Sequence, residues 1–393
     1  MSGKKRDGYE GASLVCPHCG GDARFVERRG KWCTSLLGAI RLQRCYYHCR
    51  RCGEGHVPWD QSLGLGKAAL TPAASEVASI AGVQTSFAQS AETTLHKLCG
   101  LRLSESTVER VTEGAGERLK RLLADKVTFG QDQPWAWQRD ARGRSCAYVG
   151  LDATGVRQQG ERGAKADGRM AYVGMIYNPR SDHDEEAPQR HCVRYLAGFY
   201  ELDELGLQLR RQAAEVGWDD AQQQIALSDG GSGLEEFFRK NFPRAECILD
   251  FWHAAEHLTE LALALWPSDE QLRCQRAAAW RRQLKHEGGL RILGVLKTID
   301  LDAHPPAARA AHADCVRYFQ NHQHRMDYPR YLANGWQIGS GPVESACKTV
   351  VANRLKGSGM RWGSQGADAV CHLRALYLSQ PGQWDVFWKT YPN

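Results

Sequence analysis

Residues 145–154 read SCAYVGLDAT, a run of mostly apolar residues that ends in a single carboxylate, Asp152. Apolar residues rich in aromatic and β-branched types are typical of a central strand with both faces covered. Asp152 then lies where we expect the strand to leave the sheet, and open α/β sheets bind their ligands at the carboxyl ends of strands. The stretch therefore predicts an α/β fold in which Asp152 is the first of several metal-binding acids.

Later segments extend the same predicted sheet. Strands are expected over 170–177, 192–196, 225–229 and 245–250, and helices over 201–216 and 234–242. The fourth strand ends on Asp229 in front of a glycine turn, and the fifth ends on Asp250. Three strands able to pair antiparallel, then a helix, then strand–helix–strand, is the order of a ribonuclease-H-like fold. We therefore predict such a catalytic domain over residues 140–252 and 336–393.

Residues 253–335 interrupt this domain with a segment that we expect to be all-helical. Leucines recur at helical spacing over 258–265, and a proline pair at 305–306 breaks the segment near its middle. The sequence GSGPVES at 339–345 then places a glycine turn before a helix with a proline in its first turn. Glu344 is therefore expected near the positive end of that helix.

Asp152, Asp229 and Glu344 come from distant parts of the chain and could together hold two divalent cations. Phosphodiester chemistry in two-metal sites uses ions about 3.5–4 Å apart, which clamp the attacking and leaving oxygens. Mg²⁺ prefers oxygen ligands and is commonly held by a few carboxylates together with water and substrate phosphate. The three acids are therefore our candidate ligands for Mg²⁺ or Mn²⁺.

Two C-x-x-C pairs near the N-terminus predict a metal site of another kind. The four residues are Cys16, Cys19, Cys49 and Cys52. Four thiolates at this spacing are typical of a zinc ribbon, and a glycine after each pair lets backbone amides turn toward the sulfurs. The residues between the pairs are expected to form hairpin strands. We therefore predict structural Zn²⁺ at this end of the chain.

Cys45 and His48 compete as zinc ligands, but the symmetry of the two C-x-x-C pairs favours Cys49 and Cys52. We assign residues 1–66 to the zinc ribbon, with its last nine residues as a linker.

Residues 67–130 are expected to form a small helical module. Thr71 and Ser104 are predicted N-caps of its first and last helices, and Pro72 suits the first helical position. The turn before Ser104 favours a helix-turn-helix whose last helix enters the major groove of DNA. A plain three-helix packing module is the alternative.

Composition sets outer bounds on these assignments. The chain has 393 residues, 42% of them hydrophobic and 24% charged, which predicts more than one domain with buried cores. Its net charge of +6 permits nucleic-acid binding without requiring it. The sequence contains no run of 18 or more apolar residues, so we expect no transmembrane helix. Residues 1–7 lack the apolar region of a secretory signal. The other cysteines are expected to be buried small hydrophobic residues.

Four blocks of sequence carry a resemblance to a known family. They read LSDGGSGL at 227–234, DFWH at 250–253, GSGPVESACK at 339–348 and RLKGSGMRW at 354–362. In this order they resemble the DDE transposases of the ISKra family of bacterial insertion sequences, which are related to Mutator-like elements. The resemblance extends over nearly the whole chain, the cysteine ribbon included. It implies a ribonuclease-H-like domain with a helical insertion before the last acid.

The resemblance also implies an activity. A transposase of this family binds the terminal repeats of its element, cleaves the DNA with two divalent metal ions, and joins the freed 3′-hydroxyl to target DNA. Carried onto this sequence, the catalytic acids are Asp152, Asp229 and Glu344.

The position of the second acid has a competitor. Mutator relatives usually have Cys-x-x-His after the fifth strand, where this chain has Asp250 and His253. The Asp-Gly context and the place at the end of the fourth strand favour Asp229 over Asp250. His253 and His257 stand on one helix face, and metal binding, support of the fold and contact with DNA stay open for both.

Basic residues after Glu344 are candidates for DNA binding. Lys348 stands one helical turn along the same face, and the strip continues in Arg354, Lys356 and Arg361. Trp362 offers a ring on which an unpaired base could stack. A solvated basic helix with a core tryptophan is the alternative.

The expected partners are the terminal inverted repeats and the target DNA, with a homodimer or higher oligomer assembling on DNA and no membrane partner. The expected location is cytoplasmic, and nucleoid-associated when bound to DNA. Two other functions stay open: an inactive, transposase-derived zinc-ribbon protein that binds DNA, and a structure-specific nuclease on the same fold.

Overall fold

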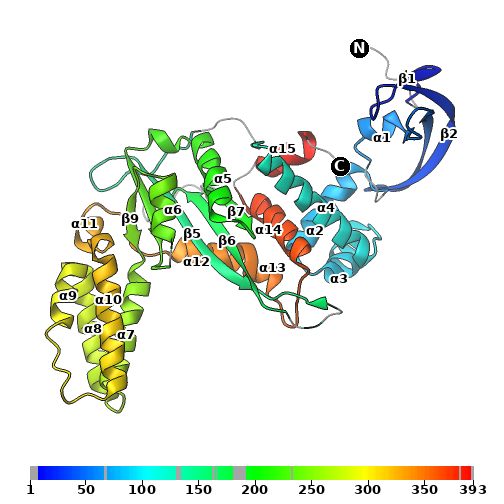
Figure 1. Ribbon diagram of the computed structural model, residues 1–393. Helices are drawn as coiled ribbons and strands as arrows, with labels where there is room; N and C mark the ends of the chain where they lie inside the picture. The colour runs from blue at the N-terminus through cyan, green and yellow to red at the C-terminus, as the bar shows by residue number, and fades with distance from the viewer. Residues whose placement is uncertain are drawn as a thin grey trace. The chain divides into compact units, whose positions relative to one another are not determined.

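The computed structural model describes residues 8–65, 69–129, 134–161, 164, 166–179, 192–231, 233–379 and 382–390, so residues 1–7 lie outside it. The chain is mixed α/β (Figure 1). It forms two compact units. Unit 1 comprises Met1–Asp125, His372–Tyr377 and Pro381–Asn393, and unit 2 comprises Lys126–Cys371 and Leu378–Gln380. Among the described helices, none is long and apolar enough to cross a bilayer.

The ribbon of unit 1 is a four-stranded antiparallel sheet in the order β1-β2-β3-β4. Its elements are β1 (Ser13–Val15), β2 (Asp22–Ser35), β3 (Gly38–Cys49), β4 (Gly55–His56) and α1 (Pro58–Ser62). The long hairpin of β2 and β3 runs between the two C-x-x-C pairs, as the sequence predicts. Its register pairs Ala23 with Cys49 at one end and Ser35 with Gly38 at the other, so both cysteine pairs lie at one end of the sheet.

The predicted linker over residues 58–66 is wrong for its first half, because Pro58–Ser62 is a helix. Pro58 stands at the first helical position, where its missing N–H costs nothing. Asp60 in the same turn accepts a hydrogen bond from the Arg44 guanidinium of β3, which holds the helix against the sheet.

Besides α1, unit 1 contains the helices α2 (Pro72–Gln84), α3 (Phe87–Gln89), the π-helix η1 (Ser90–Leu98), α4 (Glu105–Ala124) and α15 (Gln383–Thr390). Thr71 and Ser104 cap α2 and α4 as predicted, each accepting a backbone N–H of the first turn. The two helices approach closely at Gly82, where an added Cβ would lie 2.1 Å from Thr112 Oγ1. The three-helix arrangement thus exists, and α4 as a DNA-recognition helix stays a prediction.

The C-terminal residues differ from the predicted domain boundaries. We assigned residues 336–393 to the catalytic domain, whereas α14 (Ser364–Leu378) begins in unit 2 and His372–Tyr377 belong to unit 1 with the residues after 381. Trp384 donates to Glu76 Oε1 at 3.0 Å, and Phe387 lies 4.6 Å from the Arg118 guanidinium. The aromatic residues of α15 therefore hold the tail to the helices of unit 1.

Unit 2 is built on a five-stranded sheet in the order β7-β6-β5-β8-β9. The strands are β5 (Cys146–Val156), β6 (Arg169–Tyr177), β7 (Val193–Gly198), β8 (Gln223–Ser228) and β9 (Glu246–Leu249). β5, β6 and β7 pair antiparallel in series, and β8 and β9 are added parallel to β5. All five predicted strands are present.

The prediction that the first strand ends at Asp152 is wrong. β5 stays paired with β6 as far as Val156 opposite Arg169, whereas its parallel pairing with β8 ends at Gly150 opposite Leu227. Asp152 therefore lies within β5, two residues beyond the last partner in β8. β5 thus extends beyond the end of β8 but not beyond its pairing with β6. Asp152 therefore has no β8 residue opposite it.

Helices cover both faces of the sheet (Figure 1). Those that pack on it are α5 (Leu202–Glu215), α6 (Leu234–Asn241) and α12 (Gly341–Ala346), which continues as the π-helix η5 (Cys347–Ala352) and α13 (Asn353–Leu355). Leu205 and Leu209 of α5 lie against Gly174 of β6. Val343 of α12 lies against Gly150, where an added Cβ would come within 2.3 Å of it.

Gly150 determines which face of the sheet carries the site. Gly174 pairs with Leu151, so the side-chain direction at Gly174 and Leu151 is opposite to that at Gly150 and Asp152. Asp152 therefore points to the face on which α12 packs. The absence of a side chain at Gly150 lets α12 approach there, which brings Glu344 toward Asp152.

The predicted insertion is all-helical among its described elements and begins at Phe251. Its elements are α7 (Phe251–Leu265), α8 (Glu270–Glu287), α9 (Gly289–Leu296), α10 (Pro306–His322), the 3₁₀ turn η4 (Gln323–Arg325) and α11 (Tyr328–Ala333). α7, α8, α9 and α10 pack against one another (Figure 1). The break near the middle of the segment falls before Pro306, which starts α10.

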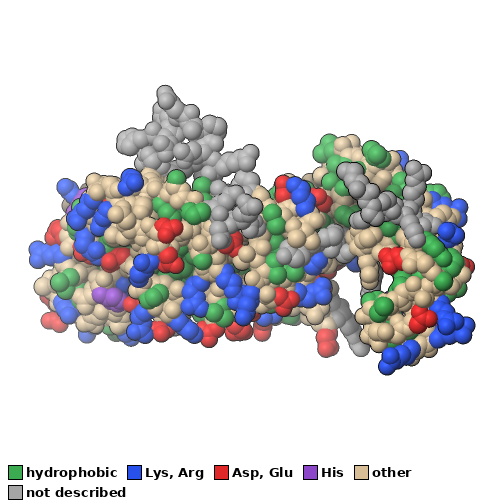
Figure 2. Space-filling model, turned by 90° about the horizontal axis from the view of Figure 1, so that it is seen from above, with side chains coloured by type: hydrophobic (Ala, Val, Ile, Leu, Met, Phe, Trp, Pro, Cys, Tyr) green, Lys and Arg blue, Asp and Glu red, His purple; other side chains and the backbone are tan. Residues whose placement is uncertain are grey.

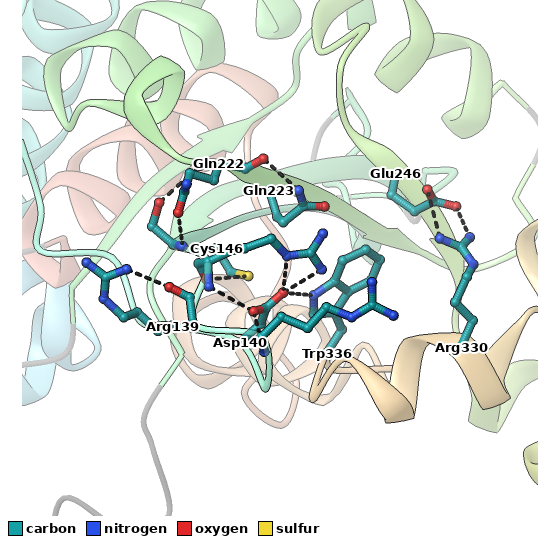
Figure 3. Close-up of polar contacts among 12 residues, drawn as sticks. Arg139, Asp140, Cys146, Gln222, Gln223, Glu246, Arg330 and Trp336 are labelled. Atoms are coloured by element: carbon teal, nitrogen blue, oxygen red, sulfur yellow. Dashed lines mark hydrogen bonds and ion pairs between the residues drawn. The ribbon is translucent and has the colours of Figure 1, made fainter.

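The chain segment that leaves the insertion, which includes Arg330 and Trp336, is held at the amino-terminal ends of β5 and β9 (Figure 3). Asp140 accepts from the Arg144 guanidinium at 2.7 Å and from Trp336 Nε1 at 3.2 Å. Arg330 of α11 donates to Glu246 of β9 at 2.6 Å. These contacts fix the chain just before it runs toward α12.

From Trp336 the chain follows the length of β5. The amide of Gln337 donates to the Tyr148 hydroxyl at 3.3 Å, and Val343 then reaches Gly150. The segment thus runs from the start of β5 toward Asp152, and Cys347, three residues after Glu344, interacts with both carboxylates.

Candidate functional site

Asp152 and Asp229 lie close enough to interact electrostatically. Burial raises the pKa of Asp152 above its ordinary value, and the negative charge of Asp229 raises it further. Hydrogen bonds from its own Ala153 amide and from the Cys347 thiol act in the opposite direction. Two carboxylates of the predicted set therefore share one site and repel each other, which a divalent cation between them would relieve.

Glu344 joins this site from α12. Its carboxylate accepts from the Ser340 hydroxyl at 2.8 Å and lies 4.0 Å from His253 Nδ1. About half of the side chain is exposed, so it keeps access to solvent. Ligand atoms of Asp250, His253 and Glu344 all lie within 4.8 Å of one another, an arrangement that could hold a metal ion.

Both carboxylate oxygens of Asp250 accept hydrogen bonds from backbone amides. It is fully buried and caps α7, with Oδ1 accepting the His253 amide at 2.6 Å. Its Oδ2 accepts the backbone amide of Ser340 in the turn before Glu344. Asp250 thus ties the start of the insertion to the turn that presents Glu344.

We expect Asp250→Ala to lower the free energy of unfolding of unit 2 by about 2–4 kcal/mol. Loss of a helix N-cap costs about 1 kcal/mol, and a buried amide left without a partner costs about 1–3 kcal/mol more. Urea unfolding followed by tryptophan fluorescence measures the change. Asp269→Ala is the matched control, because Asp269 caps α8 at an exposed position. An equal loss in the two variants would show that the contact with Ser340 contributes nothing.

The two predicted histidines have different surroundings. Burial alone would lower the pKa of His253, but the carboxylates of Asp250 and Asp229 outweigh it and raise the pKa. His257 lies with its ring centroid 3.8 Å from that of Tyr318 in the insertion, and burial lowers its pKa. The structure therefore brings His253 to the acids and packs His257 against α10 within the insertion.

The predicted basic strip divides into exposed and buried members. Lys348, Lys356 and Arg361 are exposed, and Lys356 Nζ donates to Thr154 Oγ1 of β5. Arg354 is 2% exposed and Trp362 is 8% exposed, with the guanidinium 4.8 Å from the ring. Burial contradicts the expectation that Trp362 offers a free ring to a base, and it gives Arg354 a packing role.

Sequence reasoning missed two residues of the site. Cys347 donates its thiol to Asp152, and burial together with the charge of Asp152 raises its pKa. Trp252 is 59% exposed on the first turn of α7 and lies against the Gly339 backbone beside Asp250. The DFWH block at 250–253 contains this tryptophan, so its place next to an acid and a histidine was a usable signal.

The four predicted zinc ligands do come together. Cys16 Sγ lies 3.7 Å from Cys52 Sγ, and Cys19 Sγ lies 3.6 Å from Cys49 Sγ. Four sulfurs about 2.3 Å from a tetrahedral zinc ion stand about 3.8 Å apart, so these distances fit that ion. The cluster could therefore hold a zinc ion, and its sulfur-only donor set suits one.

Contacts around Cys49 favour its thiolate, whereas the neighbouring cysteines raise the pKa of Cys52. The backbone amides of Cys52 and Arg51 donate to Cys49, which lowers the pKa of its thiol. His56 Nε2 lies 3.1 Å from Cys16 Sγ, a contact that the sequence pattern did not indicate. The competing ligands lie elsewhere: Cys45 is fully buried in the sheet core, and His48 pairs with Arg24 in the hairpin.

The acidic site also has a donor set that fits its expected ion. Carboxylates from β5, the turn after β8 and α12 offer hard oxygen donors, which Mg²⁺ and Mn²⁺ prefer. Comparison of the sequence with models of known protein families and with curated proteins finds no match.

Proposed function

We propose that the chain is a DNA transposase whose unit 2 is a ribonuclease-H-like catalytic domain. The strand order β7-β6-β5-β8-β9, with three antiparallel strands followed by two parallel ones, supports this fold. A helical segment between β9 and α12 occupies the place of the insertion that the family resemblance implies.

One observation carries the proposal. Asp152 of β5 and Asp229 after β8 interact electrostatically, and α12, which carries Glu344, packs on β5. The pKa of Asp152 is raised by burial and, to a smaller extent, by the charge of Asp229, and perturbed carboxylates of this kind are common at functional sites. Such a set suits two-metal cleavage of DNA.

The proposed ligands of the two divalent ions are Asp152, Asp229 and Glu344. Bound ions would supply charge that stabilises the attacking and leaving oxygens of an in-line displacement. We prefer Asp229 to Asp250 because both oxygens of Asp250 already accept backbone amides in the interior. His253 lies beside the acids with a raised pKa and is placed to donate to a phosphate oxygen.

Other residues support binding to DNA. Lys348, Lys356 and Arg361 are exposed on the elements that follow Glu344. Figure 2 shows Lys and Arg side chains spread among acidic ones on the face in view, which agrees with a modest net charge of +6. We propose that these residues contact the terminal repeats and the target DNA, and that a homodimer or larger oligomer holds both ends.

The experiment uses the purified chain, Mg²⁺ and labelled DNA that carries the sequences flanking the gene. We expect cleavage at the element ends and covalent joining of the new 3′-ends to a second DNA, both abolished by EDTA. Cleavage without joining and without preference for those sequences would favour a nuclease. Tight binding to DNA with no metal-dependent cutting would contradict the proposed activity.

We expect Trp252→Ala to weaken binding of single-stranded DNA by about 1–3 kcal/mol, because an exposed ring beside the acids can stack on an unpaired base. Fluorescence anisotropy with a labelled strand of about 12 nucleotides in EDTA measures the affinity. Leu263→Ala, which removes another exposed apolar side chain of α7, should leave it unchanged. Weakening by Trp362→Phe instead would return the stacking role to Trp362.

A further inference from the structure

Arg325 links the end of the insertion to the end of β8. It lies in the 3₁₀ turn after α10 and is 2% exposed. Its Nη2 donates to Ser228 Oγ at 2.8 Å, and its Nη1 lies 3.7 Å from Glu235 Oε2 in the first turn of α6. One guanidinium thus contacts residues on both sides of Asp229.

Ser228 connects Arg325 to Asp229 through hydrogen bonds. Ser228 Oγ accepts from Arg325 and donates to the backbone oxygen of Asp229 at 3.1 Å, so its hydroxyl orientation is fixed. The Asp229 carboxylate in turn accepts the Gly231 amide at 2.9 Å. These bonds determine where the peptide of Asp229 lies and how its side chain leaves the strand.

Two more residues of the insertion meet the same turn. The Tyr318 ring of α10 packs on Gly230, where an added Cβ would lie 2.8 Å from the hydroxyl oxygen. His324 Nε2 lies 2.8 Å from Glu235 Oε1, which is the carboxylate that also faces Arg325. The insertion therefore contacts three residues around Asp229, namely Ser228, Gly230 and Glu235.

Burial of the Arg325 guanidinium is energetically costly. A guanidinium removed from water loses several kcal/mol of hydration, and a single partly exposed carboxylate returns only part of it. A buried apolar side chain at position 325 would avoid that cost. Apolar packing cannot, however, orient the Ser228 hydroxyl and the Glu235 carboxylate at the same time.

We propose that Arg325 is a positioning residue for the second metal-binding acid, so that the Asp229 side of the site assembles only while the insertion is docked on the turn after β8. The inference rests on the proposed function in one respect, since it takes Asp229 to be a metal ligand. It assigns to the helical insertion a part in building the site itself.

The test compares Arg325→Gln, Ser228→Ala and the double variant with the wild-type chain. Arg317→Gln is the matched control, because Arg317 lies on the preceding helix, is exposed and pairs with Asp314 three residues before it. Mn²⁺ alone is the probe, and its affinity is followed by electron paramagnetic resonance. Hydrogen exchange of the amides in residues 228–231 in metal-free protein gives a second readout that needs no metal.

We expect Arg325→Gln and Ser228→Ala each to weaken Mn²⁺ binding about 10-fold, the lower end for loss of a group that orients a metal ligand. Both should speed exchange of the turn amides, and Arg317→Gln should change neither. Because Arg325 acts through Ser228, the double variant should lose no more than the larger single loss. Arg325→Lys keeps the positive charge but loses the planar guanidinium with its several N–H donors. Its Mn²⁺ affinity should therefore lie between those of the wild type and Arg325→Gln.

Several results would overturn the proposal. Unchanged Mn²⁺ affinity and exchange in Arg325→Gln would do so, and so would fully additive losses in the double variant. Ser228→Ala protects the test against misfolding of the arginine variant, because it removes a single oxygen atom. A wild-type chain that binds no Mn²⁺ would instead contradict the proposed function, and the exchange readout would still decide whether Arg325 orders the turn.

Discussion

Asp152→Asn should reduce the rate of DNA cleavage by about 10³-fold or more. Loss of one group that stabilises transition-state charge costs about 10²–10³-fold, and a carboxylate that holds metal ions contributes at least as much. The amide is nearly isosteric, so the geometry of β5 is retained while the charge is lost. Single-turnover cleavage of labelled element-end DNA in Mg²⁺ measures the effect.

The same substitution should leave the metal-free fold equally stable or more stable. The pKa of Asp152 is raised in the folded state by burial and by Asp229, so its ionised form opposes folding at every pH above that raised pKa. Replacing it with a neutral amide removes this cost at pH 7. Thermal melting in EDTA should therefore show no decrease in Tm, in contrast to the loss of activity.

Asp203→Asn is the control for a general effect of charge, because Asp203 is an exposed acid of unit 2 that pairs with Lys240. It should change neither the cleavage rate nor the melting temperature measurably. Undiminished cleavage by Asp152→Asn would remove the central acid from the mechanism and would falsify the proposed active site.

The five strands of unit 2 could be predicted from the sequence because each is a short apolar run between turn residues. The end of β5 could not, since it depends on which neighbour continues beside it. β6 accompanies β5 to Val156, but β8 stops pairing at Leu227, and a pattern within residues 145–154 contains neither fact. The glycine at 150 had a clear role only once Val343 was seen to pack there.

The candidate acids carry more local sequence signal than the residues that surround them. Asp229 and Glu344 stand next to glycine turns, and Asp152 follows an apolar run, all of which local sequence reveals. The burial of Trp362 depends on its pairing with residues 157–159, and the role of Arg325 depends on how α10 meets β8. Both are consequences of tertiary packing between distant segments, and they therefore carry little local signal.

Asp250 illustrates what structure adds to an open alternative. Sequence context left it in competition with Asp229, because both follow predicted strands. The structure distinguishes them by hydrogen bonding: Asp250 accepts two backbone amides in the interior, whereas Asp229 is partly exposed in a glycine turn. A carboxylate already committed to two buried amides is a poorer ligand for a metal that must also meet substrate.

The ribbon should depend on metal for its fold. The buried core at its cysteine end consists of Cys16, Ala23, Cys45, Tyr47 and Cys49, three of which are cysteines. A core this small cannot offset the entropy of ordering the hairpin, and structural zinc sites in small modules contribute about 10–16 kcal/mol of apparent binding energy. We therefore expect the hairpin to unfold when the metal is lost.

Cys16→Ser combined with Cys49→Ser removes one thiolate from each pair. Elemental analysis of the full chain should find about one zinc per wild-type protomer and almost none in the double variant. Exchange of the hairpin amides over residues 22–49 should rise toward the unfolded rate, as it should in wild type treated with a strong chelator. The strands of unit 2 have their own core and should keep their protection.

Cys45→Ala tests whether the effect is specific to the four zinc ligands, because Cys45 belongs to the same core but not to the cluster. Cys45 is fully buried in the core of this sheet, outside the four-cysteine cluster, so its loss should leave zinc content unchanged and lower stability only slightly. Loss of zinc in Cys45→Ala would give Cys45 the place assigned to a C-x-x-C thiol, and retention in the Cys16/Cys49 double variant would refute the ribbon. Because Cys16, Cys45 and Cys49 belong to one core, a difference in zinc content between the two variants reports which cysteines hold the metal.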